Sequence, residues 1–143
     1  MKVDLHMPEP RSQTILRYTR QAVTDRRLIV SKFSAHVVDS YFEMTPLGQR
    51  CVKFRETEGD TTAVIAAMDH NLQIVDRYIK GVVKSFPADL EEAWVSHLPD
   101  PYQIECKREL VRRYGFIPAI APAPNNTVHA SFGDTLREFG EFV

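Results

Sequence analysis

The sequence has few of the residues that mark secreted, membrane or redox proteins. Two cysteines occur in 143 residues, and Cys51 and Cys106 lie far apart without a C-x-x-C pattern. Small secreted domains usually carry a denser disulfide framework, so we expect two reduced, buried thiols. No apolar run approaches the roughly 20 residues that span a bilayer. The N-terminus also lacks the apolar stretch of a secretory signal, and these absences together predict a cytoplasmic protein without membrane contact.

The sequence also has no large excess of positive or negative charge. The formal net charge is −1, so overall electrostatics do not draw the protein to nucleic acid or to an anionic membrane, and any such binding needs a local patch. The composition, with 43% hydrophobic and 26% charged residues, is typical of a globular protein. A chain of this length is expected to form one domain with its own core.

Sequence patterns for catalysis and cofactor binding are absent too. The chain has no G-x-G-x-x-G, G-x-x-x-x-G-K or G-x-S-x-G motif, which removes common templates for nucleotide binding and acyl transfer. The histidines, which do not have the spacings of zinc sites, are His6, His36, His70, His97 and His129. Glu91 and Glu92 form either an acid–base pair or a negative first turn that suits a helix dipole, and the second interpretation is favoured. We therefore expect no cofactor, no metal and no enzymatic activity.

The sequence does contain residues that are typical of helix starts and ends. They are clearest over residues 85–116, which predict two short helices. Pro87 suits the first turn of the first helix. The apolar stripe of this helix consists of Leu90, Ala93, Trp94 and Leu98. Asp100 is the predicted N-cap of the second helix, whose inner face consists of Tyr102, Cys106, Leu110 and Tyr114. Gly115 suits a left-handed residue after this helix, with Phe116 packing back onto it.

The first half of the chain predicts further helices. Residues 12–28 predict a basic helix with Ser12 as its cap, and another helix is expected to begin near Ser31 or Ser34. The apolar face of that second helix consists of Phe33, Val37, Val38, Tyr41 and Phe42. Residues 52–57 alternate apolar and charged side chains, which predicts a brief strand.

Asp60 is a good cap for the longest helix, which Gly81 closes. The apolar residues of this helix recur every three or four positions and are Val64, Ile65, Met68, Leu72, Val75, Tyr78 and Ile79. The sequence as a whole predicts a mainly α protein, a compact bundle of about five helices with one candidate strand pair. Its predicted parts are a flexible N-terminus (residues 1–11), a helical domain (12–117) and a proline-rich linker with a C-terminal tail (118–143).

Nucleic-acid binding is one functional hypothesis. The residues expected to contact phosphate are Arg17, Arg20, Arg26, Arg27 and Lys32. Residues 107–116 look like the first half of a helix-turn-helix, but the prolines that follow cannot build a recognition helix. Residues 41–50 look like the wing of a winged-helix regulator, although little chain precedes them. An ordinary solvated basic face is the competing interpretation.

Partner binding is the other hypothesis. The candidate contact residues are Trp94, Tyr102, Phe132, Leu136, Phe139 and Phe142. The tail that carries the last four residues either docks on a partner or packs back on its own domain, and the sequence leaves both open. The apolar helix faces also favour a homo-oligomer over a monomer.

Three strings carry a family resemblance: FSAHVVDSYF, HNLQIVDRYIKG and FPADLEEAWVSHLPDPYQIECKRELVRRYGF. Together they resemble small uncharacterised proteins of temperate phages and prophages, encoded near the lysogeny control region. The resemblance covers residues 31–118, and it transfers no catalytic or binding residue. It implies a phage-type regulatory or host-interaction protein. Together with the basic residues named above, it leads us to expect a regulator that binds double-stranded DNA in transcription control. The alternative is an adaptor or inhibitor that binds a host or phage protein through its tail.

Overall fold

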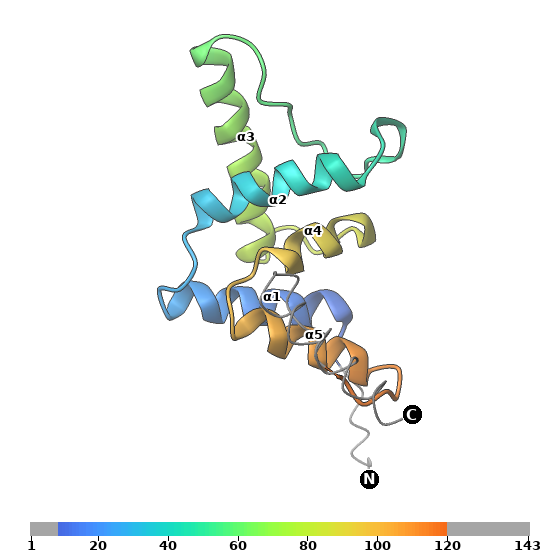
Figure 1. Cartoon of the computed structure of the whole chain (residues 1–143). Coiled ribbons are helices and arrows are strands. Elements are labelled where there is room, and N and C mark those ends of the chain that lie inside the picture. The colour runs from blue at the N-terminus through green and yellow to red at the C-terminus, as the bar shows by residue number, and fades with distance from the viewer. Residues whose placement is uncertain (1–8, 120–143) are drawn as a thin grey trace, which may run out of the picture.

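The computed structural model describes residues 9–119, which form helices and connecting segments. The helices are α1 (Arg11–Thr24), α2 (Val30–Met44), α3 (Thr61–Ile79), α4 (Glu91–Ser96) and α5 (Tyr102–Arg112), with 3-10 turns η1 (Leu47–Gln49) and η2 (Ala88–Leu90). Helices α1 and α5 lie side by side, α4 lies between them and α2, and α3 crosses α2 and extends beyond it (Figure 1). The prediction of a compact helical protein is confirmed. No helix within residues 9–119 is long and apolar enough to cross a membrane.

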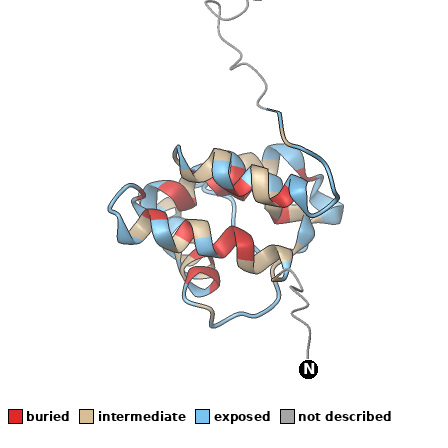
Figure 2. Cartoon of the chain, turned by 90° about the horizontal axis from the view of Figure 1, so that it is seen from below, coloured by how far each residue is buried: buried red, intermediate tan, exposed pale blue. Residues whose placement is uncertain are grey.

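The core is built around the indole ring of Trp94, which is fully buried. The rings of Phe33, Phe86 and Tyr78 contact it edge-on, with centroids 4.9, 5.2 and 6.2 Å away. Its Nε1–H donates a 2.8 Å hydrogen bond to Thr19 Oγ1. Figure 2 shows that buried residues lie on the sides of the helices that face one another. The predicted apolar stripe of residues 90–98 is therefore confirmed as the centre of the core.

The strand predicted for residues 52–57 is wrong, because the part of the chain that is described contains no strand. The alternation that suggested it is nevertheless present, since Val52 and Phe54 are buried and their neighbours are exposed. The Asn71 side chain of α3 accepts a 2.7 Å hydrogen bond from Arg55 N and donates one of 2.8 Å to Arg55 O. A buried amide therefore satisfies backbone groups that a neighbouring strand would otherwise pair.

Both predicted ends of α3 are confirmed. Asp60 Oδ1 accepts a 2.8 Å hydrogen bond from Ala63 N, as expected of an N-cap. At the other end Gly81 has φ +76°, a conformation that glycine adopts without steric cost. The backbone N–H of the next residue, Val82, donates to Arg77 O at 3.0 Å and closes the helix.

The other predicted caps are wrong. No side-chain cap hydrogen bond is present at the start of α1, α2 or α5. The residues misassigned as caps are Ser12, Ser31, Ser34 and Asp100. Helix α1 already begins with Thr14 N donating to Pro10 O at 3.2 Å, and α2 with Phe33 N donating to Ile29 O at 2.9 Å. These starts are set by packing of the helices and not by a local capping residue.

The apolar face predicted for α3 is half confirmed. Val75, Tyr78 and Ile79 in its C-terminal half are buried. Ile65 and Met68 in its N-terminal half are 60% and 48% exposed, which corrects the prediction that they pack in the core. The reason is that α3 crosses α2 and its N-terminal end extends beyond it (Figure 1), so α2 covers Ile65 and Met68 only in part.

Helix α5 shows a similar split. Cys106 and Leu110 are buried on its inner face, as predicted. Tyr114 and Phe116 are 68% and 67% exposed, so the prediction that they pack against the domain is wrong. Gly115 has the predicted positive φ, +81°. The chain therefore leaves α5 without folding back on it over these residues.

The two cysteines have different surroundings. Burial raises the pKa of the Cys106 thiol to about 12. Cys51, which was also predicted to be buried, is exposed beside η1, and its backbone N–H donates to Asp89 Oδ2 at 3.1 Å. The prediction of two buried thiols is therefore correct for one of them.

Candidate functional site: an interhelical groove and a basic corner

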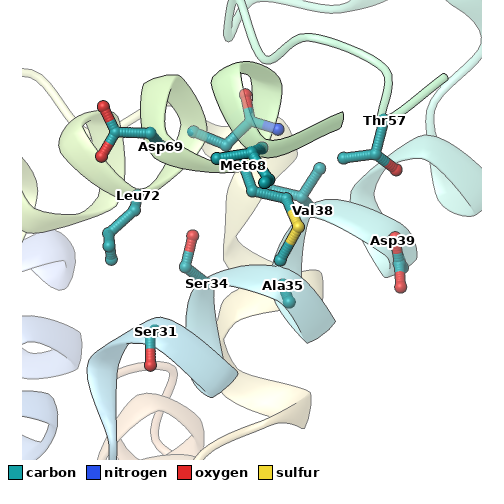
Figure 3. Close-up of a pocket in the computed structure, with 11 residues that line it drawn as sticks. Ser31, Ser34, Ala35, Val38, Asp39, Thr57, Met68, Asp69 and Leu72 are labelled. Carbon is teal, nitrogen blue, oxygen red and sulfur yellow. The ribbon is translucent and has the colours of Figure 1, made fainter. Parts of the chain in front are cut away.

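A groove with a volume of about 480 Å³ lies between α2 and α3 (Figure 3). Small side chains of α2 form one wall, namely Ser31, Ser34 and Ala35. The other wall comes from apolar side chains of α3, namely Ile65, Met68 and Leu72. In Figure 3 the Met68 side chain extends from α3 toward Ala35, and the small residues opposite leave the space unfilled. The groove thus lies between helix α2 and the exposed apolar residues of α3.

The charged residues that line this groove are all acidic. Of the residues that line it, Asp39 on α2 and Asp69 on α3 are the charged ones, and none is cationic. The two carboxylates lie at opposite ends of the drawn cluster (Figure 3). Gln73 Nε2 donates to Asp69 Oδ2 at 3.2 Å, which fixes one of them on the helix surface. The groove therefore has an apolar middle between two acidic ends.

Two of the five cations predicted to contact phosphate are engaged in contacts within the protein. Arg17 Nη2 lies 2.7 Å from Glu9 Oε1 and 2.6 Å from Glu109 Oε2. This hydrogen bond from Arg17 lowers the pKa of Glu9. Arg20 Nε donates to Ile79 O at 2.6 Å. Both arginines are therefore engaged within the protein, one in tying α1 to α5 and one in tying α1 to α3.

The other three cations gather at the turn between α1 and α2, which we call the basic corner (Arg26, Arg27 and Lys32). All three are exposed, and within residues 9–119 none of them forms an ion pair. Arg27 N donates to Ala22 O at 2.8 Å and Arg26 N to Val23 O at 3.0 Å, so the turn closes α1 with paired hydrogen bonds. Arg26 has φ +59°, a left-handed conformation that usually requires glycine.

Beside this corner is a cleft that sequence reasoning missed. Arg27, Lys32, His36 and His97 help to line its volume of about 220 Å³. The two imidazole rings lie 5.5 Å apart between centroids, and His97 Nε2 is 2.6 Å from Ser40 Oγ. His36 and His97 are far apart in the sequence and share no motif spacing. Only the packing of α4 against α2 brings them together, so no sequence signal could have revealed the pair.

The Ser40–His97 contact is one part of a nucleophile–base arrangement. Such a base is normally oriented by a third group on its other ring nitrogen, and within residues 9–119 no carboxylate hydrogen-bonds to His97. Burial, and next the charge of His36, lower the pKa of His97, whereas Asp39 and Glu43 act in the opposite direction. Among the described residues the arrangement therefore lacks the oriented base of a Ser–His catalytic site.

The other predicted functional residues are placed as follows. Trp94 cannot serve as an exposed partner anchor because it is fully buried, and that prediction is wrong. Tyr102 is half-buried, and its hydroxyl donates to a carboxylate oxygen of Asp25. Glu91 accepts bonds of 2.6 and 2.7 Å from Arg11, which agrees with a structural role and not with an acid–base pair. The tail residues lie outside the described residues and are Phe132, Leu136, Phe139 and Phe142.

A family model matches residues 12–100 of the sequence. The chain belongs to the DUF8585 family, a family of unknown function. The DUF8585 match includes α2 to α4 and all of α1 except Arg11, and therefore both the groove and the basic corner. An uncharacterized protein of Xylella fastidiosa (strain 9a5c) is 35% identical over 144 residues, which cover 100% of this chain and 70% of that relative. No solved structure matches the chain.

Neither match has a stated activity, so the resemblance to prophage proteins, DNA binding and partner binding all stay predictions at this point.

Proposed function

We propose that this DUF8585 protein is a cytoplasmic protein-binding module whose α2–α3 groove accepts an amphipathic helix of a partner. The observation that carries the proposal is the exposure of Ile65 and Met68 beside a groove of about 480 Å³. Contiguous exposed apolar surface with polar edges is typical of interaction sites, and a helix that presents apolar residues at i, i+3 and i+7 is a common occupant of such grooves.

The charges of the groove limit the chemistry of that partner. Asp39 and Asp69 lie at its two ends, and the residues that line it include no cation. A helix with Lys or Arg on either side of its apolar stripe would complement both carboxylates, whereas an acidic helix would be repelled. The expected occupant is therefore a basic amphipathic helix. This proposed interface differs from the one suggested by the sequence, which consisted of the tail together with Trp94 and Tyr102.

The proposal can be tested by selecting peptides from a displayed library of helical sequences on the full-length protein. We expect enriched peptides to carry apolar residues at helical spacing together with Lys or Arg. They should lose about tenfold or more in affinity for Met68→Glu, because the variant replaces an apolar contact in the middle of the groove with a carboxylate that binding would desolvate. Val82→Glu is the matched control, since Val82 is exposed outside the groove. Peptides that bind both variants equally would overturn the proposal.

The second candidate is DNA binding in transcription control, as the phage-type hypothesis suggests. Its support is the basic corner, where three exposed cations lie without an ion-pair partner in residues 9–119. Three phosphate contacts predict weak, strongly salt-dependent binding. Fluorescence anisotropy with a duplex should show binding at low salt that is lost in the triple variant Arg26→Gln, Arg27→Gln, Lys32→Gln. Absence of binding to any duplex at low salt would exclude this candidate.

A further inference from the structure

We propose that the cleft lined by Arg27, Lys32, His36 and His97 is a binding site for a phosphate group. This inference shares two cations with the DNA-binding candidate but does not require that candidate. It is also independent of the groove, because Lys32 and His36 occupy one face of α2 while Ser31 and Ala35 occupy the neighbouring face.

The lining of the cleft combines apolar and cationic side chains. Leu28, Phe33 and Pro99 are among its apolar residues. The polar residues that line it are Arg27, Lys32, His36 and His97, and none of the lining residues is a carboxylate. Arg27 and Lys32 therefore place two positive charges beside two imidazole rings, and an anion bound between them would interact favourably with all four side chains. Arginine, lysine and protonated histidine are the side chains that form charge-assisted hydrogen bonds to phosphate oxygens.

The neighbouring turn adds a third cation to this surface at a conformational cost. Arg26 occupies the left-handed position that ends α1, whereas the corresponding position at the end of α3 is occupied by Gly81. A residue other than glycine in this conformation is strained, and such residues concentrate at functional sites. The exposed Arg26 side chain therefore adds positive charge next to the cleft at a position where glycine would be easier to accommodate.

The two histidines supply a reporter for the site. On α2, the groups near His97 are His36, Ser40, Asp39 and Glu43, while Arg27 and Lys32 line the same cleft. Burial and His36 keep the pKa of His97 low in the free protein. A phosphate dianion in the cleft favours the protonated ring, so binding should raise the pKa of His97. By linkage, protonation of the ring should strengthen phosphate binding by the same factor.

Phosphate binding in the cleft can be tested by NMR. The imidazole Cε1–H signals of the full-length protein are followed while inorganic phosphate replaces chloride at constant ionic strength. The expected result is a saturable shift of His36 and His97 with a rise in the pKa of His97, and no change at His70. Lys32→Gln should weaken phosphate binding about tenfold through loss of a charge-assisted bond. Lys53→Gln is the matched control, because Lys53 is exposed and lies outside the cleft.

Two further ligands identify the source of the phosphate. A nucleoside monophosphate that reproduces the shifts at lower concentration supports a small phosphate-bearing ligand. A short duplex that shifts His36 and His97, with loss in Lys32→Gln, supports the cleft as a subsite for a nucleic-acid backbone. If millimolar phosphate, nucleotide and duplex all leave both histidines unchanged, the inference is overturned. Duplex binding that depends on the basic corner but shifts neither histidine signal would overturn the inference that the cleft binds phosphate. It would still support the DNA-binding candidate.

Discussion

Trp94 and Thr19 are joined by a 2.8 Å hydrogen bond from the indole Nε1–H to the threonine Oγ1, in the fully buried space between α4 and α1. The Thr19 hydroxyl in turn donates to Ile15 O at 2.8 Å, so its oxygen serves both as donor and acceptor. The bond satisfies the one polar group of the largest side chain in the core. It therefore ties the position of α4, which carries His97 at its end, to α1.

Thr19→Val should lower the free energy of unfolding by about 1–3 kcal/mol, because valine keeps the shape of threonine and leaves the buried indole N–H unpaired. Urea denaturation measures this loss. Thr24→Val on the same helix is the control, since Thr24 is exposed and its replacement should change stability by about 0.5 kcal/mol or less. Equal losses in the two variants would show that the hydrogen bond does not stabilise the core.

Arg26→Gly should raise the free energy of unfolding by about 1 kcal/mol, because glycine relieves the left-handed conformation at φ +59°. Arg27→Gly is the control, because it removes the same charge at a residue that does not have a positive φ. This variant should lower the free energy of unfolding, because glycine increases the conformational entropy of the unfolded chain. Thermal unfolding of the two variants compares them directly. A decrease for Arg26→Gly as large as that for Arg27→Gly would contradict the assigned strain.

The two thiols should react with a disulfide reagent at very different rates. Cys51 is exposed, whereas Cys106 is buried with its pKa raised to about 12, and the thiolate is the reactive form. Under native conditions we expect fast labelling of one thiol per chain and slow labelling of the second, which becomes fast in denaturant. Cys51→Ser should remove the fast phase. A fast phase that persists in Cys51→Ser would place Cys106 at the surface.

The depressed pKa of His97 predicts a loss of stability in mild acid. Its ordinary value is 6.5, so as the pH falls below this value the unfolded chain takes up the proton before the folded protein does. The stability that the neutral ring contributes is present above the unfolded pKa and is lost as the pH falls through the folded one. Denaturant midpoints between neutral and mildly acidic pH should fall less steeply for His97→Gln than for the wild type. His70→Gln, at a residue outside the cleft, should keep the wild-type slope.

The sequence predicts helices well where the chemistry is local. Asp60 caps α3 as expected, because the carboxylate that accepts the bond lies three residues before the N–H that donates it. Ser12 and Ser34 have the same capping chemistry but do not cap, since helix packing extends α1 and α2 past them. Residues 52–57 have the alternation of a strand, yet their pairing partner is the side chain of Asn71 on α3. Alternation determines which side chains are buried but does not identify the partner.

The candidate site was less predictable for a physical reason. The periodicity of α3 shows that Ile65 and Met68 share a face, but it cannot show that α2 covers this face only in part. Likewise, a run of arginines does not reveal that Arg17 is neutralised by Glu109 of a distant helix. Both outcomes depend on contacts between helices that are far apart in the chain.

Peptide binding in the α2–α3 groove can be tested by the affinity of a selected basic amphipathic peptide for the wild type and three variants. These are Met68→Glu, Val82→Glu and the double variant Asp39→Asn, Asp69→Asn. Circular dichroism of each variant should show an intact fold, because all four side chains are at the surface. We expect loss of binding in Met68→Glu, wild-type affinity in Val82→Glu, and a weaker salt dependence in the double variant. Wild-type affinity in Met68→Glu would contradict the account, as would concentration-dependent dimerisation through the groove that excludes the peptide.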